Sequence, residues 1–409
     1  MKRIINWVLS LTLIFSATLL SSCSSDDGPS TYEKNRNDMH DHIKKDLTVL
    51  SETLNFDAMN MSAEVTKQFI QLTGKSRHLM DDLKAAMILA TVQNVTLNTH
   101  IHGMRVILDE KGNYDISPAE GLVFIFPATI EGRGTNLYKM TLKNSKNWNE
   151  ASGAFTMTMS ALYNDKEVVL NKAELNITKE NEYAMGIAGL MLGAFKMNSK
   201  LQYFPIAGES EDVASSINIG MKRDENGSLS LGITYSQKEQ TIMNTGFIFP
   251  LAQDFPLTDI DTTIENSEFI TAYATILNDI HIGGTINRGK EFLPVWKELF
   301  ANASLPADQY NELVKKLDEQ LEMYIVCGRR GNMVEMKLTG DQDAEGNHLM
   351  PTFDFDNSSH FTALKDVLDA TTMETLKNTY KYTALPVTNA ATTYSDMISI
   401  LMRVLPVKE

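Results

Sequence analysis

The acidic hexapeptide Asp341–Gly346 has oxygen ligands at a spacing that could hold a metal ion. Its carboxylates stand at positions 1, 3 and 5 and a glycine stands at position 6, as in the opening of an EF-hand calcium loop. Position 12 is Thr352 instead of that loop's bidentate glutamate, and no helix evidently precedes the segment. We therefore predict either a structural Ca²⁺ held by Asp341, Asp343 and Glu345, or an acidic hairpin turn.

Two histidines form a second candidate metal site. His100 and His102 lie two residues apart in an extended run, so both side chains would project from one face of a strand. Such a His-x-His pair can supply two ligands to a metal. No third ligand is evident nearby, and the simpler interpretation is a solvated strand face.

Catalytic motifs give no support for an enzyme. The segment 284–290 has the spacing of a phosphate-binding loop, but Glu291 stands where a serine or threonine must bind Mg²⁺, so we predict an ordinary loop. His40 and His42 fall on the polar side of an expected helix, where Asp38 and Asp46 flank His42 at surface ion-pair spacing. The sequence contains no Gly-x-Ser-x-Gly, His-Glu-x-x-His or Ser-x-x-Lys motif.

Composition excludes several classes of protein. The chain has 409 residues, a length that predicts two or three globular lobes. Its 37 basic and 52 acidic residues give a net charge of −15, which argues against nucleic acid as a partner because phosphate binding needs clustered Lys and Arg. Cys23 and Cys327 are its only cysteines, too few for a disulfide framework or a cysteine zinc site, and Cys327 is expected to be a small buried side chain.

The amino-terminal segment has the pattern of a secretory leader. Lys2 and Arg3 precede an apolar stretch over 4–20, which is short for a membrane-spanning helix and is interrupted by hydroxyl side chains. It ends in Leu20-Ser21-Ser22-Cys23, which resembles the lipobox of bacterial lipoproteins. The resemblance implies cleavage of a signal peptide over 1–22, thioether lipidation of Cys23, and acylation, for example with palmitate, of the new amino terminus.

An acidic tether, 23–31, follows the leader and has no apolar side chain to pack. It is similar to the Ser/Asp-rich tag that directs some Gram-negative lipoproteins to the outer face of the cell. We therefore expect a protein of the outer membrane, lipid-anchored and exposed at the cell surface; the alternative is the periplasmic face. Loss of Lys2 and Arg3 with the leader leaves 35 basic against 52 acidic residues, a net charge of −17.

The hydrophobic period predicts helices at both ends of the body of the chain. Residues 32–90 are expected to form a helical layer, with Ser62 as the N-cap of its second helix. A further stripe begins after Pro306 and continues to Leu321 and Tyr324, and two more helical stretches are expected over 361–380 and 395–405.

The middle of the chain has the period of two that is typical of strands. Apolar residues alternate with polar ones over 155–161 and 173–177, and hairpins are expected around Asn226-Gly227 and around Gly331-Asn332. Alternation of this kind belongs to antiparallel sheet with one solvated face. The predicted fold class is α+β, with antiparallel sheets in meander and hairpin connections packed against helices.

Two features bear on domain organisation. Phe124-Ile125-Phe126-Pro127 recurs as 247–250, which indicates either a duplicated β-unit or two strands that end alike by chance. The segment 183–197 is apolar on every face and is expected to be a strand, because its three glycines would destabilise a helix. We place one lobe over 32–205 and a second, β-rich lobe with carboxyl-terminal helices over 206–409.

Three functions remain open from the sequence. The first is a non-catalytic binding protein for an apolar or glycan-type ligand, with Tyr and Phe as sugar platforms because Trp148 and Trp296 are the only tryptophans after the leader. The second is a structural or assembly component with a partner protein in the envelope, and the third is an extracellular hydrolase. No cofactor is expected apart from the calcium described above.

Overall fold

The structure is a computed structural model. It describes residues 31–93, 103–146, 152–163, 166–179, 194–205, 213–238, 240–252, 255, 260–277, 279–301, 305–328, 332–343 and 346–401.

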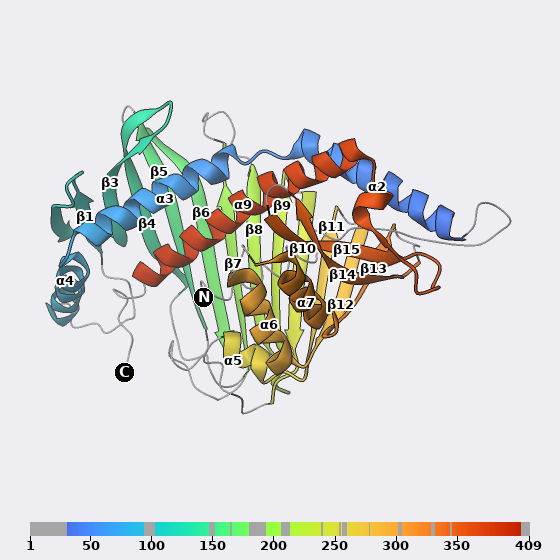
Figure 1. Ribbon diagram of the computed structural model, residues 1–409. Helices are drawn as coiled ribbons and strands as arrows, with labels where there is room; N and C mark the ends of the chain where they lie inside the picture. The colour runs from blue at the N-terminus through green and yellow to red at the C-terminus, as the bar shows by residue number, and fades with distance from the viewer. Residues whose placement is uncertain are drawn as a thin grey trace.

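A single sheet of 16 strands, formed by the described residues, is the centre of the fold (Figure 1). Its order is β16-β15-β14-β13-β12-β11-β10-β9-β8-β7-β6-β5-β4-β3-β1-β2, so β2 and β16 lie at the two edges. Neighbouring strands are antiparallel, except that β1 and β3 are parallel. In chain order the strands are β1 (Met104–Leu108), β2 (Tyr114–Pro118), β3 (Leu122–Ile130), β4 (Gly134–Lys146), β5 (Ser152–Tyr163), β6 (Lys166–Lys179), β7 (Phe195–Tyr203), β8 (Ser215–Arg223), β9 (Leu229–Gln237), β10 (Gln240–Phe249), β11 (Phe269–Ile276), β12 (Ile280–Asn287), β13 (Leu321–Cys327), β14 (Val334–Asp343), β15 (Gly346–Asp354) and β16 (Phe361–Ala363).

The predicted fold class, an α+β fold with several antiparallel sheets, is wrong. Most strands pair with the strand that follows them in the chain, so one continuous sheet forms. The boundary expected at 205/206 falls between β7 and β8, which pair from Phe195 opposite Arg223 to Tyr203 opposite Ser215. Alternation shows that a strand has one buried face, but it does not show where one sheet ends and another begins.

The two Phe-Ile-Phe-Pro segments have different surroundings, so the expected β-unit duplication is not seen. Pro127 lies inside β3, which pairs with β1 in parallel and with β4 in antiparallel orientation. Pro250 lies just beyond β10, which pairs with β9 and β11 in antiparallel orientation. What the segments share is a buried phenylalanine pair on one face of the sheet.

Helices cover one side of this sheet (Figure 1). α3 and α9 lie side by side across the strands, and α6 and α7 lie below them on the same side. None of the helices in the described ranges is both long and apolar enough to cross a membrane. The helices are α2 (Thr31–Thr53), α3 (Asp57–Lys75), α4 (Leu79–Gln93), α5 (Ile260–Glu265), α6 (Gly289–Ala301), α7 (Ala307–Asp318), α8 (Leu364–Val367) and α9 (Ala370–Leu401).

The helical layer predicted for 32–90 is confirmed, with corrected boundaries. α3 begins at Asp57, and Ser62 is buried inside it, where its hydroxyl accepts a hydrogen bond from the Asn171 side-chain amide. α7 ends at Asp318, so Leu321 and Tyr324 belong to β13 and not to the helical stripe.

Other sequence predictions have mixed outcomes. The hairpins over 217–235 and 324–338 are confirmed, as are the strands at 155–161 and 173–177. Residues 361–363 form β16 instead of a helix, and α9 runs without interruption from Ala370 to Leu401. The apolar segment 183–197 lies outside the described residues as far as 193, and its last three residues begin β7.

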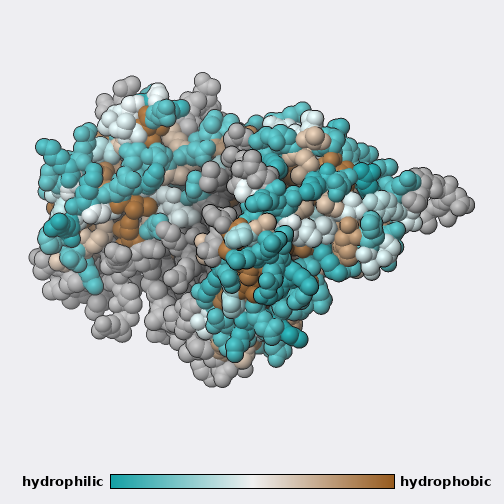
Figure 2. Space-filling view, in the orientation of Figure 1, coloured by the Kyte–Doolittle hydropathy of each residue, from teal (hydrophilic) through white to brown (hydrophobic). Residues whose placement is uncertain are grey.

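The core lies between the sheet and the helices. Along β5, β7 and β9 every second side chain is buried against this layer, and methionines such as Met157, Met159 and Met197 fill it. Phe69 of α3 packs against Phe124 and Phe126 of β3, with ring centroids 5.2 and 5.1 Å apart. Burial of one such phenylalanine contributes roughly 1.5–3 kcal/mol. The outer surface of the helical side is largely hydrophilic (Figure 2).

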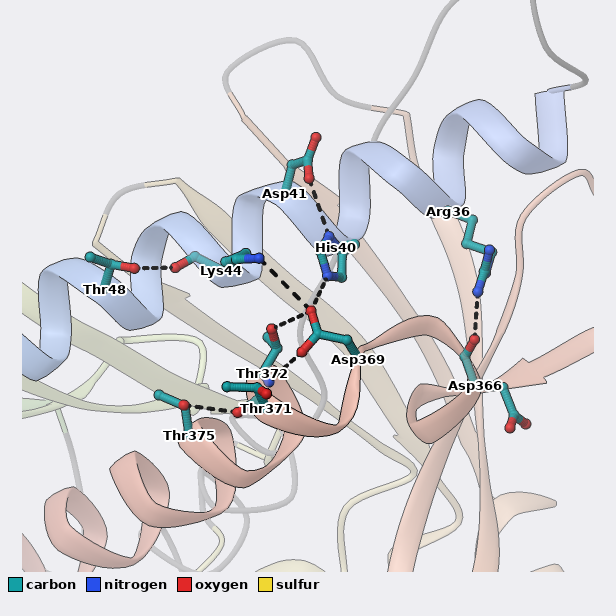
Figure 3. Close-up of polar contacts among 10 residues, drawn as sticks. All are labelled: Arg36, His40, Asp41, Lys44, Thr48, Asp366, Asp369, Thr371, Thr372 and Thr375. Carbon is teal, nitrogen blue, oxygen red and sulfur yellow. Dashed lines mark hydrogen bonds and ion pairs between the residues drawn. The ribbon is translucent and has the colours of Figure 1, made fainter.

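Polar contacts fix α2 to the start of α9 (Figure 3). Asp369 precedes α9 and accepts a hydrogen bond from the Thr372 backbone N–H at 2.8 Å, so it caps the helix. Nε2 of His40 lies 2.9 Å from the same carboxylate, and this contact together with the cap lowers the pKa of Asp369. Arg36 adds a bond to the Asp366 carbonyl at 2.7 Å.

A second contact joins α2 to the sheet and corrects the expected pairing of His42. Nδ1 of His42 lies 2.8 Å from Asp279, at the β11–β12 turn, and Nζ of Lys45 lies 2.9 Å from the same oxygen. Asp46 is buried, with Nζ of Lys45 at 4.0 Å, and His42 pairs with Asp279 instead. Burial first, and then the charge of Asp279, raise the pKa of Asp46 from 3.8 to about 6.

The buried Asp46 carboxyl predicts that stability falls as pH rises through a defined window. Below pH 3.8 the group is protonated in both the folded and unfolded chain; between that value and about 6 the unfolded chain loses the proton first. At higher pH the folded chain must hold a buried, ionised carboxylate, which lowers its stability. Asp46→Asn removes that charge and should raise the free energy of unfolding by about 1–3 kcal/mol at pH 7.5, with little effect at pH 4. Chemical denaturation at the two pH values measures the difference.

Asp38→Asn, a change of the same charge on the partly exposed side of α2, is the matched control and should show no such window. A destabilising effect of Asp46→Asn at pH 7.5 would contradict the assignment of a buried, proton-binding carboxyl.

Candidate functional site: the open face of the sheet

The side of the sheet away from the helices carries a row of glycines and tyrosines. We call this side the open face. Residues directly opposite one another in register form a line across seven successive strands, β7 to β13. Because paired residues in neighbouring strands project from the same face, all seven belong to the open face. We call this line the central row: Asn198, Gly220, Gly232, Gly246, Tyr273, Gly283 and Tyr324.

The two tyrosines of the central row lie directly over glycines of the neighbouring strands. A methyl group added to Gly283 would come 2.5 Å from Cζ of Tyr324, and one added to Gly246 would come 2.6 Å from Cζ of Tyr273. Each ring therefore occupies the space that a side chain on the next strand would fill. Tyr273 remains 37% exposed and Tyr324 41% exposed. Both rings lean in the same direction along the row, from β11 over β10 and from β13 over β12.

Polar side chains border the central row on one side. Asn218, Thr234, Asn244, Thr275 and His281 stand opposite one another in register from β8 to β12. Two links of this line are direct: Thr234 donates to Asn244 Oδ1 at 3.1 Å, and the Thr275 hydroxyl lies 3.2 Å from His281 Nδ1. The line offers a ligand hydroxyl, amide and imidazole groups that both donate and accept hydrogen bonds.

The other border combines hydroxyl and apolar groups with one carboxylate. Ser230, Ile248, Thr271, Thr285 and Glu322 stand opposite one another from β9 to β13. Ile248 is 39% exposed, and Phe269, which lies two residues before Thr271 on β11 and so on the same face, is 45% exposed. The described open face of β9 to β12 carries no Lys, Arg, Asp or Glu side chain.

This arrangement suits a ligand with flat apolar faces and polar edges. An aromatic ring exposed by one face binds polarised C–H groups through dispersion and its negative π-face. The neighbouring amides and hydroxyls can exchange hydrogen bonds with groups at the edge of such a ligand. A pyranose ring has this combination of axial C–H faces and equatorial hydroxyls.

The acidic segment predicted to bind calcium lies elsewhere, at the hairpin between β14 and β15. Both carboxylate oxygens of Asp341 lie 2.9 Å from Nζ of Lys365, and His348 Nε2 lies 3.4 Å away. Asp343 ends β14 opposite Gly346, so the segment is a hairpin turn, and Glu345 lies outside the described residues. A cation at Asp341 would have to displace the Lys365 ammonium.

The remaining predicted residues do not join the central row. His100, His102 and Cys23 lie outside the described residues. Cys327 is buried in β13, as expected for a small apolar side chain. The segment 284–290 is not a loop but the end of β12 and the start of α6. Across the described ranges, no group of three His, Cys, Asp or Glu residues could hold a metal ion.

Comparisons with known proteins add little to this geometry. No family model and no curated protein matches the sequence. Among solved structures, a porin-like protein from Bacteroides vulgatus ATCC 8482 is similar at 7% sequence identity, over 57% of this chain and 92% of that chain, with a TM-score of 0.18. A likeness of this size supports no inference about the present chain.

The position of Tyr324 predicts a specific effect of a methyl group at Gly283. In Gly283→Ala the nearest atoms to the new methyl all belong to the Tyr324 ring, which can move. We expect the variant to fold with a change in stability below about 1 kcal/mol and to lift that ring from the sheet. A crystal structure of the variant measures the ring position.

Gly220→Ala is the matched control, because it lies in the same row and its methyl would meet only Asn198 Oδ1, at an ordinary 3.7 Å. An unmoved Tyr324 ring in Gly283→Ala would show that the ring does not rest on Gly283.

Proposed function

We propose that this protein is a non-catalytic carbohydrate-binding lipoprotein of the bacterial outer membrane, which holds a polysaccharide on the open face of its sheet. The observation that carries this proposal is the pair of exposed tyrosine rings, each lying over a glycine of the next strand. Exposed aromatic side chains on a solvated sheet face cost solubility, and a stacking ligand gives them a role.

The spacing of the two rings supports a polymer over a single sugar. Tyr273 and Tyr324 are separated by β12, which places their Cα atoms about 10 Å apart. One sugar ring cannot cover both, whereas two units of one chain can. The polar line from Asn218 to His281 runs parallel to the central row and can serve several units in succession.

The polar borders favour a glycan over the apolar ligand that the sequence left open. A lipid chain would cover the line from Asn218 to His281 with hydrocarbon, which offers no hydrogen bonds in place of those that these partly exposed side chains can make to water. A sugar brings hydroxyls to those positions. The methionines that could have formed an apolar groove, such as Met157 and Met159, are instead buried in the core.

The proposed location follows from the leader. The lipobox-like sequence ending at Cys23 supports a lipid anchor, and the acidic tether supports display at the outer face of the outer membrane.

Removal of the tyrosine rings should weaken binding without unfolding the protein. We expect Tyr273→Ala/Tyr324→Ala to lose at least about tenfold in affinity, since each stacked ring contributes about 1 kcal/mol or more. Tyr273→Phe/Tyr324→Phe keeps both rings and should retain most of the affinity. Affinity gel electrophoresis of the full chain against dextran, galactomannan, xylan, polygalacturonate and chondroitin sulfate provides the measurement.

Met333→Ala, which removes a side chain that is 66% exposed and lies outside the central row, is the control and should bind like the natural chain. The proposal fails if none of the five polymers retards the protein, or if the double alanine variant binds as well as the natural chain at an unchanged melting temperature.

The anchor has its own test. Cys23→Ala removes the sulfur that the lipid requires, so the protein should move from the membrane to the soluble fraction. Mass spectrometry of the natural amino-terminal peptide should show the added acyl mass, and an unmodified Cys23 would contradict the anchor.

A further inference from the structure

We infer that the polysaccharide bound on the open face is acidic, and that Lys196 and Lys200 bind its carboxylate or sulfate groups. This inference rests on the proposed carbohydrate-binding function and names the substrate class of the same site. It is carried by the distribution of charge across the open face.

Basic side chains gather on one half of the open face. Register places six lysines there on strands β4 to β8, in a chain with 37 basic and 52 acidic residues overall. Three of them already contact acids, because Lys139 lies 2.7 Å from Glu167, Lys172 lies 2.7 Å from Glu174 and Lys222 lies 2.6 Å from Asp224. The strands beyond, β9 to β12, carry none of the four charged residue types on this face within the described residues. The six are Lys139, Lys143, Lys172, Lys196, Lys200 and Lys222.

Lys196 and Lys200 flank the end of the central row. They stand on β7 two residues before and two residues after Asn198, so their Cα atoms are about 13 Å apart with the row passing between them. Both are exposed, and among the described residues no acidic side chain lies within ion-pair distance of either; Glu174, which stands opposite Lys200, lies 2.7 Å from Lys172 instead. A polymer laid along the row from Tyr273 would pass between the two ammonium groups after four strand spacings, about 19 Å.

The strand register also places two positive charges directly opposite each other. Lys196 lies directly opposite Lys222 on β8, an arrangement that is unfavourable between neighbouring strands. An anionic group over this pair would offset the repulsion. A negatively charged ligand would therefore be attracted by the lysines and would also reduce the repulsion between them.

The lysines and the glutamates lie at opposite ends of the central row, and this distribution orients the bound polymer. Beyond the tyrosines, the opposite end of the central row is bordered by Glu322 and, opposite Tyr324, by Glu335, whose carboxylate lies 3.4 Å from Nζ of Lys337. Carboxylates at that end would repel an anionic group, so the acidic units should lie toward β7 and β8. The neutral faces of the sugar rings would stack on Tyr273 and Tyr324.

A matched pair of polymers tests this inference. Polygalacturonate and its fully methyl-esterified form share one backbone and differ in charge, and chondroitin sulfate adds a sulfated chain. Biolayer interferometry of the full chain in nonionic detergent should show binding to the acidic polymers that weakens as NaCl is raised. Lys196→Gln/Lys200→Gln should weaken that binding about tenfold at low salt. Lys67→Gln/Lys315→Gln, with the same charge change on exposed positions of α3 and α7, should leave it unchanged.

The possible outcomes distinguish failure of the acidic-ligand inference from failure of the proposed carbohydrate binding. Equal binding of the esterified and acidic polymers, with no effect of the lysine variant, would overturn the acidic ligand but leave carbohydrate binding intact. Acidic binding that depends on the lysines but not on the tyrosines would overturn the shared site. Absence of binding to every polysaccharide would overturn both proposals. Binding of oligodeoxythymidine as tight as that of polygalacturonate, and lost with the same tyrosines, would replace the glycan with single-stranded nucleic acid.

Discussion

The register between neighbouring strands is the constraint on which both faces of this molecule depend. A shift of one residue would turn every side chain of a strand to the opposite face. On one face, register aligns methionine, phenylalanine and alanine side chains under α3 and α9. On the other, it places Gly283 between Tyr273 and Tyr324, and Gly246 beneath the Tyr273 ring. The same hydrogen-bond ladder therefore specifies the core and assembles the candidate site.

The described helices lie on one side of the sheet only, so one face forms the core and the other remains available for binding. Contacts from α2, α3 and α9 supply apolar burial against the sheet. His42 with Asp279 ties α2 to the sheet, and His40 with Asp369 ties α2 to the start of α9. The open face contributes little to the core, so its residues are free to differ from those that stability requires. Glycine weakens a strand because it packs no side chain, and four glycines in one row are a cost that the overlying tyrosines partly offset.

The sequence predicted local structure well and global structure poorly. Alternation in 155–161 and the Asn226-Gly227 turn identified a strand and a hairpin because both signals lie within a few residues. The single sheet was missed because pairing across 205/206 leaves no local mark. Ser62 resembled a helix N-cap but is buried within α3, where tertiary packing overrides its preference. The central row was also missed, because its members lie on seven strands and only register brings them together. In the sequence, Tyr324 counts both at the end of a helical stripe and at the start of a hairpin. A glycine at an outward position of β12, between strands with outward tyrosines, was the available signal, but it is visible only once register is known.

The most direct test of a carbohydrate-binding open face is a crystal structure of the protein with a polygalacturonate oligosaccharide. The account predicts sugar rings stacked on Tyr273 and Tyr324, with the chain running across the strands toward Asn198. An oligosaccharide bound instead among the helices on the opposite side, with the central row in contact only with solvent, would contradict it.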